Sequence, residues 1–281
     1  MPDPAHKEPA MSATVIIPMD PSAVSQAALR PGLSLAGQLG VPVRLLSVVE
    51  RDQDRAERET VLRGLLASRG LNDGLVEVIS HPTVPEGILK TVRAAPEDPV
   101  VMATEARSVV GEAVVSSVAG QLLRQSHRPL LLAGPELADE WSGPIRTVLV
   151  CLDGSPLSEA MLEPAVTFAR SIGADLRLIQ VLRPRFGQGG DTGEWVYLRR
   201  LADHLPEQYG VQANWDVLHG KDVARAVVDY SALIQGAVIA MTTHGRTGLQ
   251  RVVMGSFARE VVHTARSPVL VLRPDESFEK E

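Results

Sequence analysis

Short apolar runs alternate with amphipathic segments along most of the chain, the pattern expected of strands and helices taken in turn. In the C-terminal half, residues 148–152 form a β-branched run that ends at the turn signal Asp-Gly-Ser, 153–155. Apolar residues then recur at helical spacing up to Gly173, which predicts a helix bent by Pro164 in its interior. Continuous apolar strands alternating with helices indicate a parallel sheet covered on both faces.

The remainder of this half continues the alternation, with further apolar runs separated by amphipathic segments. The predicted strands that follow span residues 176–182, 211–218, 237–242 and 268–273, and the predicted helices span residues 194–209, 222–235 and 257–264.

The N-terminal half repeats this unit. The 35 residues from Val15 align without a gap with the 35 residues from Val148, and 12 of these positions are identical. A second block from Met102 aligns with the block from Met241, in the same order along the chain. The chain is therefore a tandem duplication. Its predicted segments are a disordered N-terminus (1–12), a first unit (13–134), a linker (135–145), a second unit (146–274) and a tail (275–281).

Composition excludes several classes of function. The 281 residues carry 28 basic and 34 acidic side chains, a net charge of −6 that argues against a nucleic-acid or anionic-membrane surface. No apolar stretch approaches the roughly 18 residues that a membrane-spanning helix needs. A single cysteine permits neither an internal disulfide nor a cysteine zinc cluster, and it suits a reducing compartment. These features predict a cytoplasmic protein with no membrane and no nucleic-acid partner.

Ligands of open parallel sheets bind at the carboxyl ends of the strands, near the switch in strand order. In the second unit, Asp153, the strand end around Val181 and the loop THGRTGLQRVVMGS fall there. Glycines in that loop allow close approach of backbone N–H groups to an anion, and the helix start at Ser256 adds a favourable dipole. An ordinary glycine-containing loop with a helix cap is the alternative interpretation.

The loop HGRTGLQRVVMGS, together with VLVCLDGS near the start of the second unit, resembles the universal stress protein family. The resemblance covers residues 13–134 and 145–274. It implies two tandem units, each a five-stranded parallel sheet sandwiched by helices, of the Rossmann-like type found in adenine nucleotide alpha hydrolases. ATP-binding members carry Gly-x2-Gly-x9-Gly-Ser/Thr, which this chain matches from Gly245 onward, whereas Thr242 occupies the place of the first glycine.

The same resemblance implies a site for ATP, with magnesium as a candidate companion ion. Asp153 would contact the adenosine moiety, and Val181 would present its backbone to adenine. The implied phosphate-binding residues belong to one loop, which starts at Thr242, and to the helix that follows it: Gly245, Arg246, Gly255, Ser256 and the N–H of Phe257.

The first copy of the loop has lost these features. Ala106 and Ser116 stand opposite Gly245 and Gly255, so Cβ atoms crowd the backbone, and Glu105 introduces a carboxylate that repels phosphate. We therefore expect one nucleotide site, in the second unit, with the first unit as a structural pseudo-site.

Three functions remain open, in this order of preference. The first is a regulatory protein that binds ATP without rapid turnover. The second is an interaction module that has lost the nucleotide. The third is a slow ATPase, for which Asp153 and His244 are the only candidate bases. No catalytic residue is assigned, and seven scattered histidines without a paired ligand spacing predict no metal site.

Assembly is implied by the resemblance alone. Single-unit relatives commonly dimerise through their last strands, so residues 129–133 are expected to pair with residues 268–273 within this chain. Such pairing also covers two exposed sheet edges. Further association of two chains into a homodimer is left open.

Overall fold

The computed structural model describes residues 14–71, 73–104, 117–139, 141–183, 192–244 and 254–274. The predicted disordered N-terminus (1–12) and tail (275–281) lie outside the described residues.

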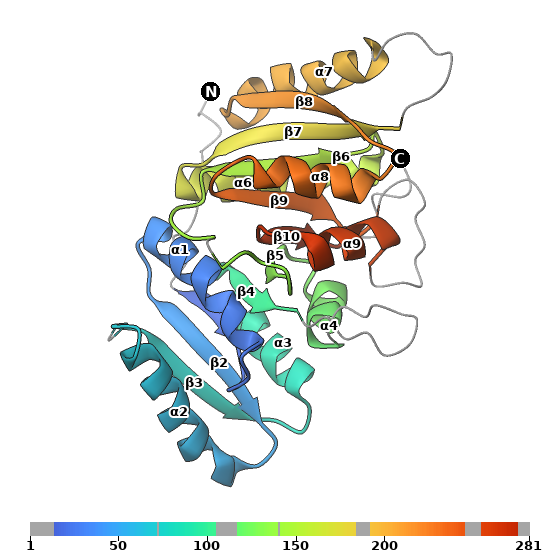
Figure 1. Cartoon of the computed structure of the whole chain (residues 1–281). Helices are drawn as coiled ribbons and strands as arrows, with labels where there is room; N and C mark the ends of the chain where they lie inside the picture. Colours follow the sequence, from blue (N-terminus) through green and yellow to red (C-terminus); the bar gives the residue numbers. More distant parts are fainter. Residues whose placement is uncertain are drawn as a thin grey trace, which may run out of the picture.

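The strands of both units join into one continuous sheet of ten strands (Figure 1). The strands of the first unit are β1 (Val15–Pro18), β2 (Val43–Val49), β3 (Leu75–Ser80), β4 (Val100–Ala103) and β5 (Leu130–Ala133). Those of the second unit are β6 (Thr147–Leu152), β7 (Asp175–Leu182), β8 (Ala213–His219), β9 (Ala237–Thr242) and β10 (Val269–Leu272). The spatial order is β3-β2-β1-β4-β5-β10-β9-β6-β7-β8. Each unit therefore repeats the same open order, with a switch between its first and fourth strands.

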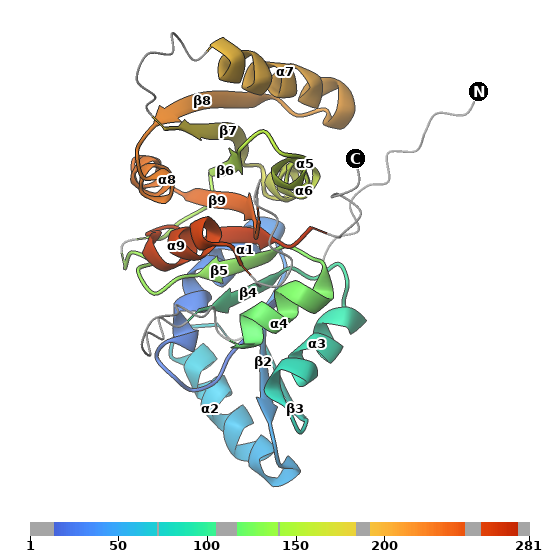
Figure 2. The ribbon, with the colours of Figure 1, turned by 90° about the vertical axis from the view of Figure 1, so that its right-hand side faces the viewer.

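Helices cover both faces of this sheet, as Figure 2 shows from the side. One face carries the 3-10 helix η1 (Ser25–Ala28) and the helices α1 (Leu29–Leu39), α2 (Arg55–Ala67), α6 (Leu162–Ile172) and α7 (Thr192–Tyr209). The 3-10 helix η2 (Asp52–Asp54) directly precedes α2, and the short helix α5 (Pro156–Glu159) precedes α6. The other carries α3 (Val84–Ala94), α4 (Ser117–Ser126), α8 (Val223–Ala232) and α9 (Ser256–Thr264). The predicted parallel sheet sandwiched by helices is thus present in both units.

The two units meet through β5 and β10. These are the only neighbouring strands of the described sheet that run antiparallel, with Leu131 opposite Leu270 at the centre of the pairing. Their side chains are almost completely buried, at 1% and 3% exposure. This pairing matches the one that the family resemblance implied, and it removes the two edges that the separate sheets would expose.

Pro164 breaks the chain into two helices, so the prediction of one bent helix was wrong. A proline has no N–H and cannot bond to the carbonyl four residues earlier. The short α5 ends at Glu159, and α6 begins at Leu162, which leaves Pro164 in the first turn of α6, where no such bond is needed. Pro31 has the same place in α1, which follows η1 in the first unit.

The segment between β5 and β6 is tied to both units. The amide of Gln38, on α1, accepts a hydrogen bond from the N–H of Ile145 at 2.7 Å and donates to its carbonyl at 2.9 Å. It also donates to the carbonyl of Ile172 at the end of α6, at 3.0 Å. The ring of Trp141 is 8% exposed and packs into the shared core. No helix in the described part of the chain has the length and apolar character to cross a membrane.

The junction leaves no room for a side chain at Gly134. A Cβ atom there would lie 2.0 Å from the carbonyl oxygen of Val262 on α9, so Gly134→Ala forces the backbones apart. We expect this variant to lower the free energy of unfolding by about 1–3 kcal/mol, measured by urea denaturation. The matched control is Gly64→Ala in α2, where a Cβ meets no neighbouring atom within 4 Å, and it should raise stability by about 0.5–1 kcal/mol. Equal stability of Gly134→Ala and the parent would contradict this account of the junction.

Candidate functional site

The switch in strand order of the second unit lies between β6 and β9, which run parallel and side by side. Val150 pairs with Ala240 in this ladder, so the last residues of both strands, Leu152 and Thr242, lie at the same level of the sheet. The segments that leave the two strands therefore start next to each other. An edge of this kind is the general ligand position of open α/β sheets.

Asp153 leaves β6 in a tight turn that fixes its carboxylate. Its Oδ1 atom accepts hydrogen bonds from the N–H of Ser155 at 3.0 Å and from the Ser155 hydroxyl at 2.5 Å. Gly154 between them has φ +79°, a conformation that glycine adopts without steric cost. Ser155 also caps α5, because its Oγ accepts from the N–H of Ser158. The sequence DGS thus sets both the turn and the helix start.

The loop that follows β9 is closed at its base by backbone hydrogen bonds. The N–H of Gly255 donates to the carbonyl of Thr243 at 2.8 Å, and the N–H of Thr243 donates to the carbonyl of Leu272 on β10 at 2.8 Å. A Cβ atom at Gly255 would lie 3.3 Å from the Thr243 oxygen, so a glycine allows this close approach. The Thr242 hydroxyl donates to the carbonyl of His244 at 2.7 Å, which turns the chain as it leaves the strand.

The N-terminus of α9 has no side-chain cap. Gly255 is its N-cap residue, with extended backbone, and it supplies no side-chain hydrogen bond to the helix. The first N–H groups of a helix have no partner within the helix, and here they include those of Ser256 and Phe257. The helix dipole adds partial positive charge at the same place. These groups suit a phosphate or carboxylate.

Val181 lies one strand farther along the edge. It is the penultimate residue of β7, half-buried, and it pairs with Leu218 of β8. Its side chain packs into the core on the face of α8 and α9.

Six of the eight predicted nucleotide-binding residues are described, and two, Gly245 and Arg246, lie outside the described residues. The structure brings those six to the carboxyl ends of three neighbouring strands, β7, β6 and β9, and to the start of α9: Asp153, Val181, Thr242, Gly255, Ser256 and Phe257.

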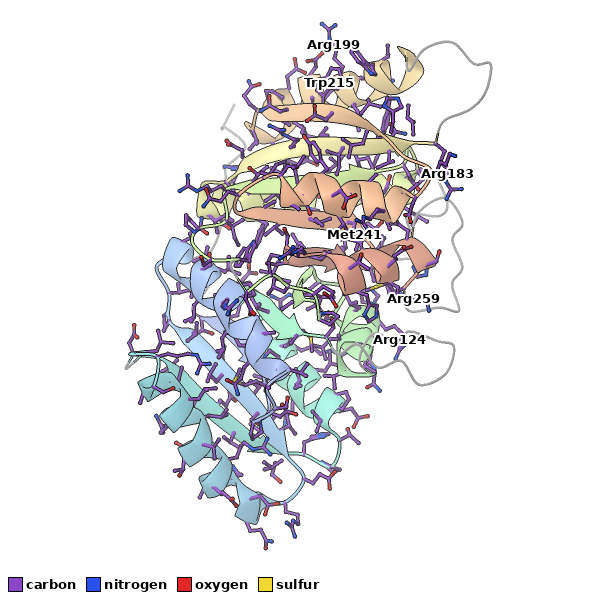
Figure 3. The ribbon with its side chains drawn as sticks, in the orientation of Figure 1. Arg124, Arg183, Arg199, Trp215, Met241 and Arg259 are labelled. Atoms are coloured by element: carbon purple, nitrogen blue, oxygen red, sulfur yellow. The ribbon has the colours of Figure 1, made fainter. Side chains whose placement is uncertain are left out.

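Two polar residues at this edge were not predicted from the sequence as site residues. Arg183 directly follows β7 and is exposed, and Figure 3 shows it beyond the end of that strand. Gln180 lies within β7 and is only 7% exposed. The available signals were a cation immediately after an apolar strand and an amide inside one.

Other chemistry is sparse near this edge. Desolvation by burial raises the pKa of the Cys151 thiol on β6 to about 12, so the sulfur stays protonated and unreactive. Within the described ranges, no group of three or more potential metal ligands lies close enough together to hold an ion.

A cavity of about 340 Å³ lies away from these strand ends, against α8, α9 and the segment after β5. Its charged lining contains four carboxylates and two guanidinium groups: Glu136, Asp222, Asp229, Glu260, Arg225 and Arg266. It includes none of the predicted site residues. Because Arg225 pairs with Asp229 at 2.9 Å, part of this charge is already compensated.

The first unit contains a close copy of the aspartate turn. The Oδ1 atom of Asp20 accepts from the N–H of Ser22 at 3.0 Å and from its hydroxyl at 2.5 Å. Desolvation acts to raise the pKa of Asp20, but the hydrogen bonds from Ser22 and Ser25 and the charge of Arg58 outweigh it, so the pKa lies below its ordinary value. Residues 105–116, which contain the altered loop of this copy, lie outside the described residues.

Comparison with known proteins supports one family for both units. A model of the universal stress protein family matches residues 11–133 and again residues 144–273. A universal stress protein of Mycobacterium tuberculosis is 26% identical over 290 residues, which covers 92% of this chain and 96% of the relative. A universal stress protein of Methanocaldococcus jannaschii is 27% identical over 141 residues, covering 46% of this chain and 82% of the relative.

Solved structures show the same fold over nearly the whole chain. A universal stress protein from Archaeoglobus fulgidus superposes with a TM-score of 0.67 at 19% identity, covering 94% of this chain and 99% of the other. A Pseudomonas aeruginosa protein of unknown function reaches 0.61 at 20% identity, covering 97% of each chain.

The lowered pKa of Asp20 predicts a pH-dependent contribution to stability. Because the folded protein binds this proton less tightly than the unfolded chain, the contribution is complete above the ordinary aspartate pKa and is lost as pH falls through the folded-state value. The destabilisation caused by Asp20→Asn, measured by urea denaturation, should therefore shrink as pH is lowered from 7 toward 3. A penalty that stays constant over this range would show that the carboxylate charge is not what the turn stabilises.

Proposed function

The chain belongs to the universal stress protein family, and from this premise we propose that its second unit binds ATP and that the protein acts as a regulatory binding protein. One observation carries the proposal. The hydrogen-bonded aspartate Asp153 and the N-terminus of α9 both follow strands that end at the switch in strand order of the second unit. Asp153 follows β6, and Gly255 is the N-cap residue of α9, at the end of the loop that leaves β9.

The two ends of ATP require different chemistry, and this edge offers both. The triphosphate is an anion, which favours the uncapped N–H groups at Ser256 and Phe257. The ribose offers hydroxyl donors, which favour a carboxylate such as that of Asp153. Its turn holds Oδ1 through two bonds to Ser155, so the group is oriented before a ligand arrives. Preorganisation of this kind reduces the cost of binding.

A regulatory role is preferred over catalysis because the two candidate bases named from the sequence each have another role. His244 shares a hydrogen bond of 3.0 Å between its Nδ1 atom and the Thr243 hydroxyl, and Asp153 is the proposed partner of the ribose hydroxyls. A general base must reach the proton that it removes. Slow ATP hydrolysis is accordingly the third candidate function.

An interaction module without nucleotide is the second candidate. Thr242 replaces the first glycine of the family pattern, and its hydroxyl is used to turn the chain toward His244. A side chain at this position removes one place where the backbone could approach phosphate closely. This alternative predicts that millimolar ATP leaves the protein unchanged. The cytoplasmic location stays a prediction from composition, and the association of two chains into a homodimer stays open.

Thermal unfolding with and without ATP and magnesium tests the proposed site. ATP at 100 times its dissociation constant should stabilise the folded protein by about 2.7 kcal/mol and raise Tm by several degrees. Gly255→Glu should abolish this shift, because the new side chain crowds the Thr243 carbonyl and places a carboxylate at the helix terminus.

The control for added charge is Gly64→Glu, the same substitution on α2 of the first unit, where a Cβ finds open space. It should keep the full ATP shift. Absence of any shift in the parent, or an equal shift in Gly255→Glu, would count against ATP binding at this edge.

A further inference from the structure

Each unit places one polar residue in the buried part of its second strand. The alignment of the two copies puts Ser47 on β2 opposite Gln180 on β7, just as it puts Asp20 opposite Asp153. Ser47 is 1% exposed and Gln180 is 7% exposed. Polar groups at such depth are almost always hydrogen-bonded, so each of the two needs a partner.

In the first unit the chain supplies that partner itself. Arg58 extends from α2 and donates from Nη1 to the Ser47 hydroxyl at 2.8 Å. Its charge also acts on Asp20, whose pKa it helps to lower. One guanidinium group therefore serves both polar positions at this end of the first unit.

In the second unit no described residue donates to the corresponding acceptor, on Gln180. The Oε1 atom of Gln180 is buried and has no hydrogen-bond partner among the described residues. By the alternation of side chains along β7, Gln180 shares the face of Leu178, which α6 and α7 cover. On the neighbouring strand it pairs with Leu152, the residue directly before Asp153. An amide oxygen without a partner among the described residues thus lies next to the turn of Asp153, whose carboxylate is the proposed contact of the ribose.

We propose that Gln180 binds the base of the nucleotide and selects adenine through its exocyclic amine. The inference rests on the proposed ATP site and adds a specificity residue to it. A glutamine amide carries one acceptor and two donors, and adenine presents an amine donor beside a ring-nitrogen acceptor, which a glutamine amide pairs in two hydrogen bonds. The amine supplies the donor that Oε1 lacks, as Arg58 does for Ser47 in the first unit.

A cycle of substitutions in protein and ligand tests this pairing. The probes are ATP and purine riboside triphosphate, which differs from ATP only in lacking the exocyclic amine. Isothermal titration should show the parent binding ATP about five- to tenfold tighter than the analogue. Gln180→Met keeps the length of the side chain and removes the amide, so its preference for ATP over the analogue should be clearly smaller than the parent's, while a contact of the base with the backbone of Val181 is retained.

Two controls separate base recognition from a structural role. Ser47→Ala, the matched change in the first unit, should keep the parent's preference for ATP. Without ligand, Gln180→Met should unfold at the same temperature as the parent or higher, because it removes a buried acceptor that none of the described residues satisfies.

The outcomes distinguish this inference from the proposal that it extends. If the parent binds neither probe, the ATP site itself is refuted. If the parent binds ATP and Gln180→Met keeps the same preference over the analogue, the ATP site stands and the role of Gln180 is refuted. A lower Tm of unliganded Gln180→Met would assign the amide to the core instead of the ligand.

Discussion

The antiparallel pairing of β5 with β10 is the contact on which the rest of the structure depends. Two parallel sheets, each with an unpaired fifth strand, would expose hydrogen-bonding edges of leucine and valine. Joined through Leu131 and Leu270, they form one sheet with continuous cores on both faces. The join also explains why Gly134 must be a glycine, since the end of β5 runs against the Val262 carbonyl of α9. The helix α9, whose N-terminus is part of the candidate site, thus packs against the same junction that joins the two units.

Duplication gave both units the same aspartate turn, but the groups around it have diverged. In the first unit Arg58 bonds to Ser47 and its charge acts on Asp20, so the polar groups near the turn are served by the chain. In the second unit the amide oxygen of Gln180, beside the turn of Asp153, has no partner in the part of the chain that the structure describes. If ATP binds in the second unit alone, as proposed, only that unit needs a polar group that is left for the ligand. The first unit still supplies the sheet partner and half of the shared core.

Much of the fold could be predicted from the sequence because its signals are local. The β9 strand has the bounds that its apolar run predicted, and Gly173 ends α6 in the left-handed conformation that favours glycine. The effect of Pro164 was predicted wrongly because it depends on where the helix starts. A proline in the interior of a helix bends it, whereas Pro164 lies in the first turn of a new helix that starts at Leu162. At the site, motifs indicated the loop and the aspartate, but the unpaired amide of Gln180 could not be found this way. Whether a buried polar group has a partner depends on residues such as Arg58 that lie on other elements.

The proposed nucleotide site lies in the second unit alone. Isothermal titration of the parent chain with ATP and magnesium measures this directly as the number of sites per chain, and we expect a stoichiometry near one. A value near two would mean that the first unit, despite Glu105 and the lost glycines of its loop, also binds nucleotide, and it would contradict the division of roles between the two units.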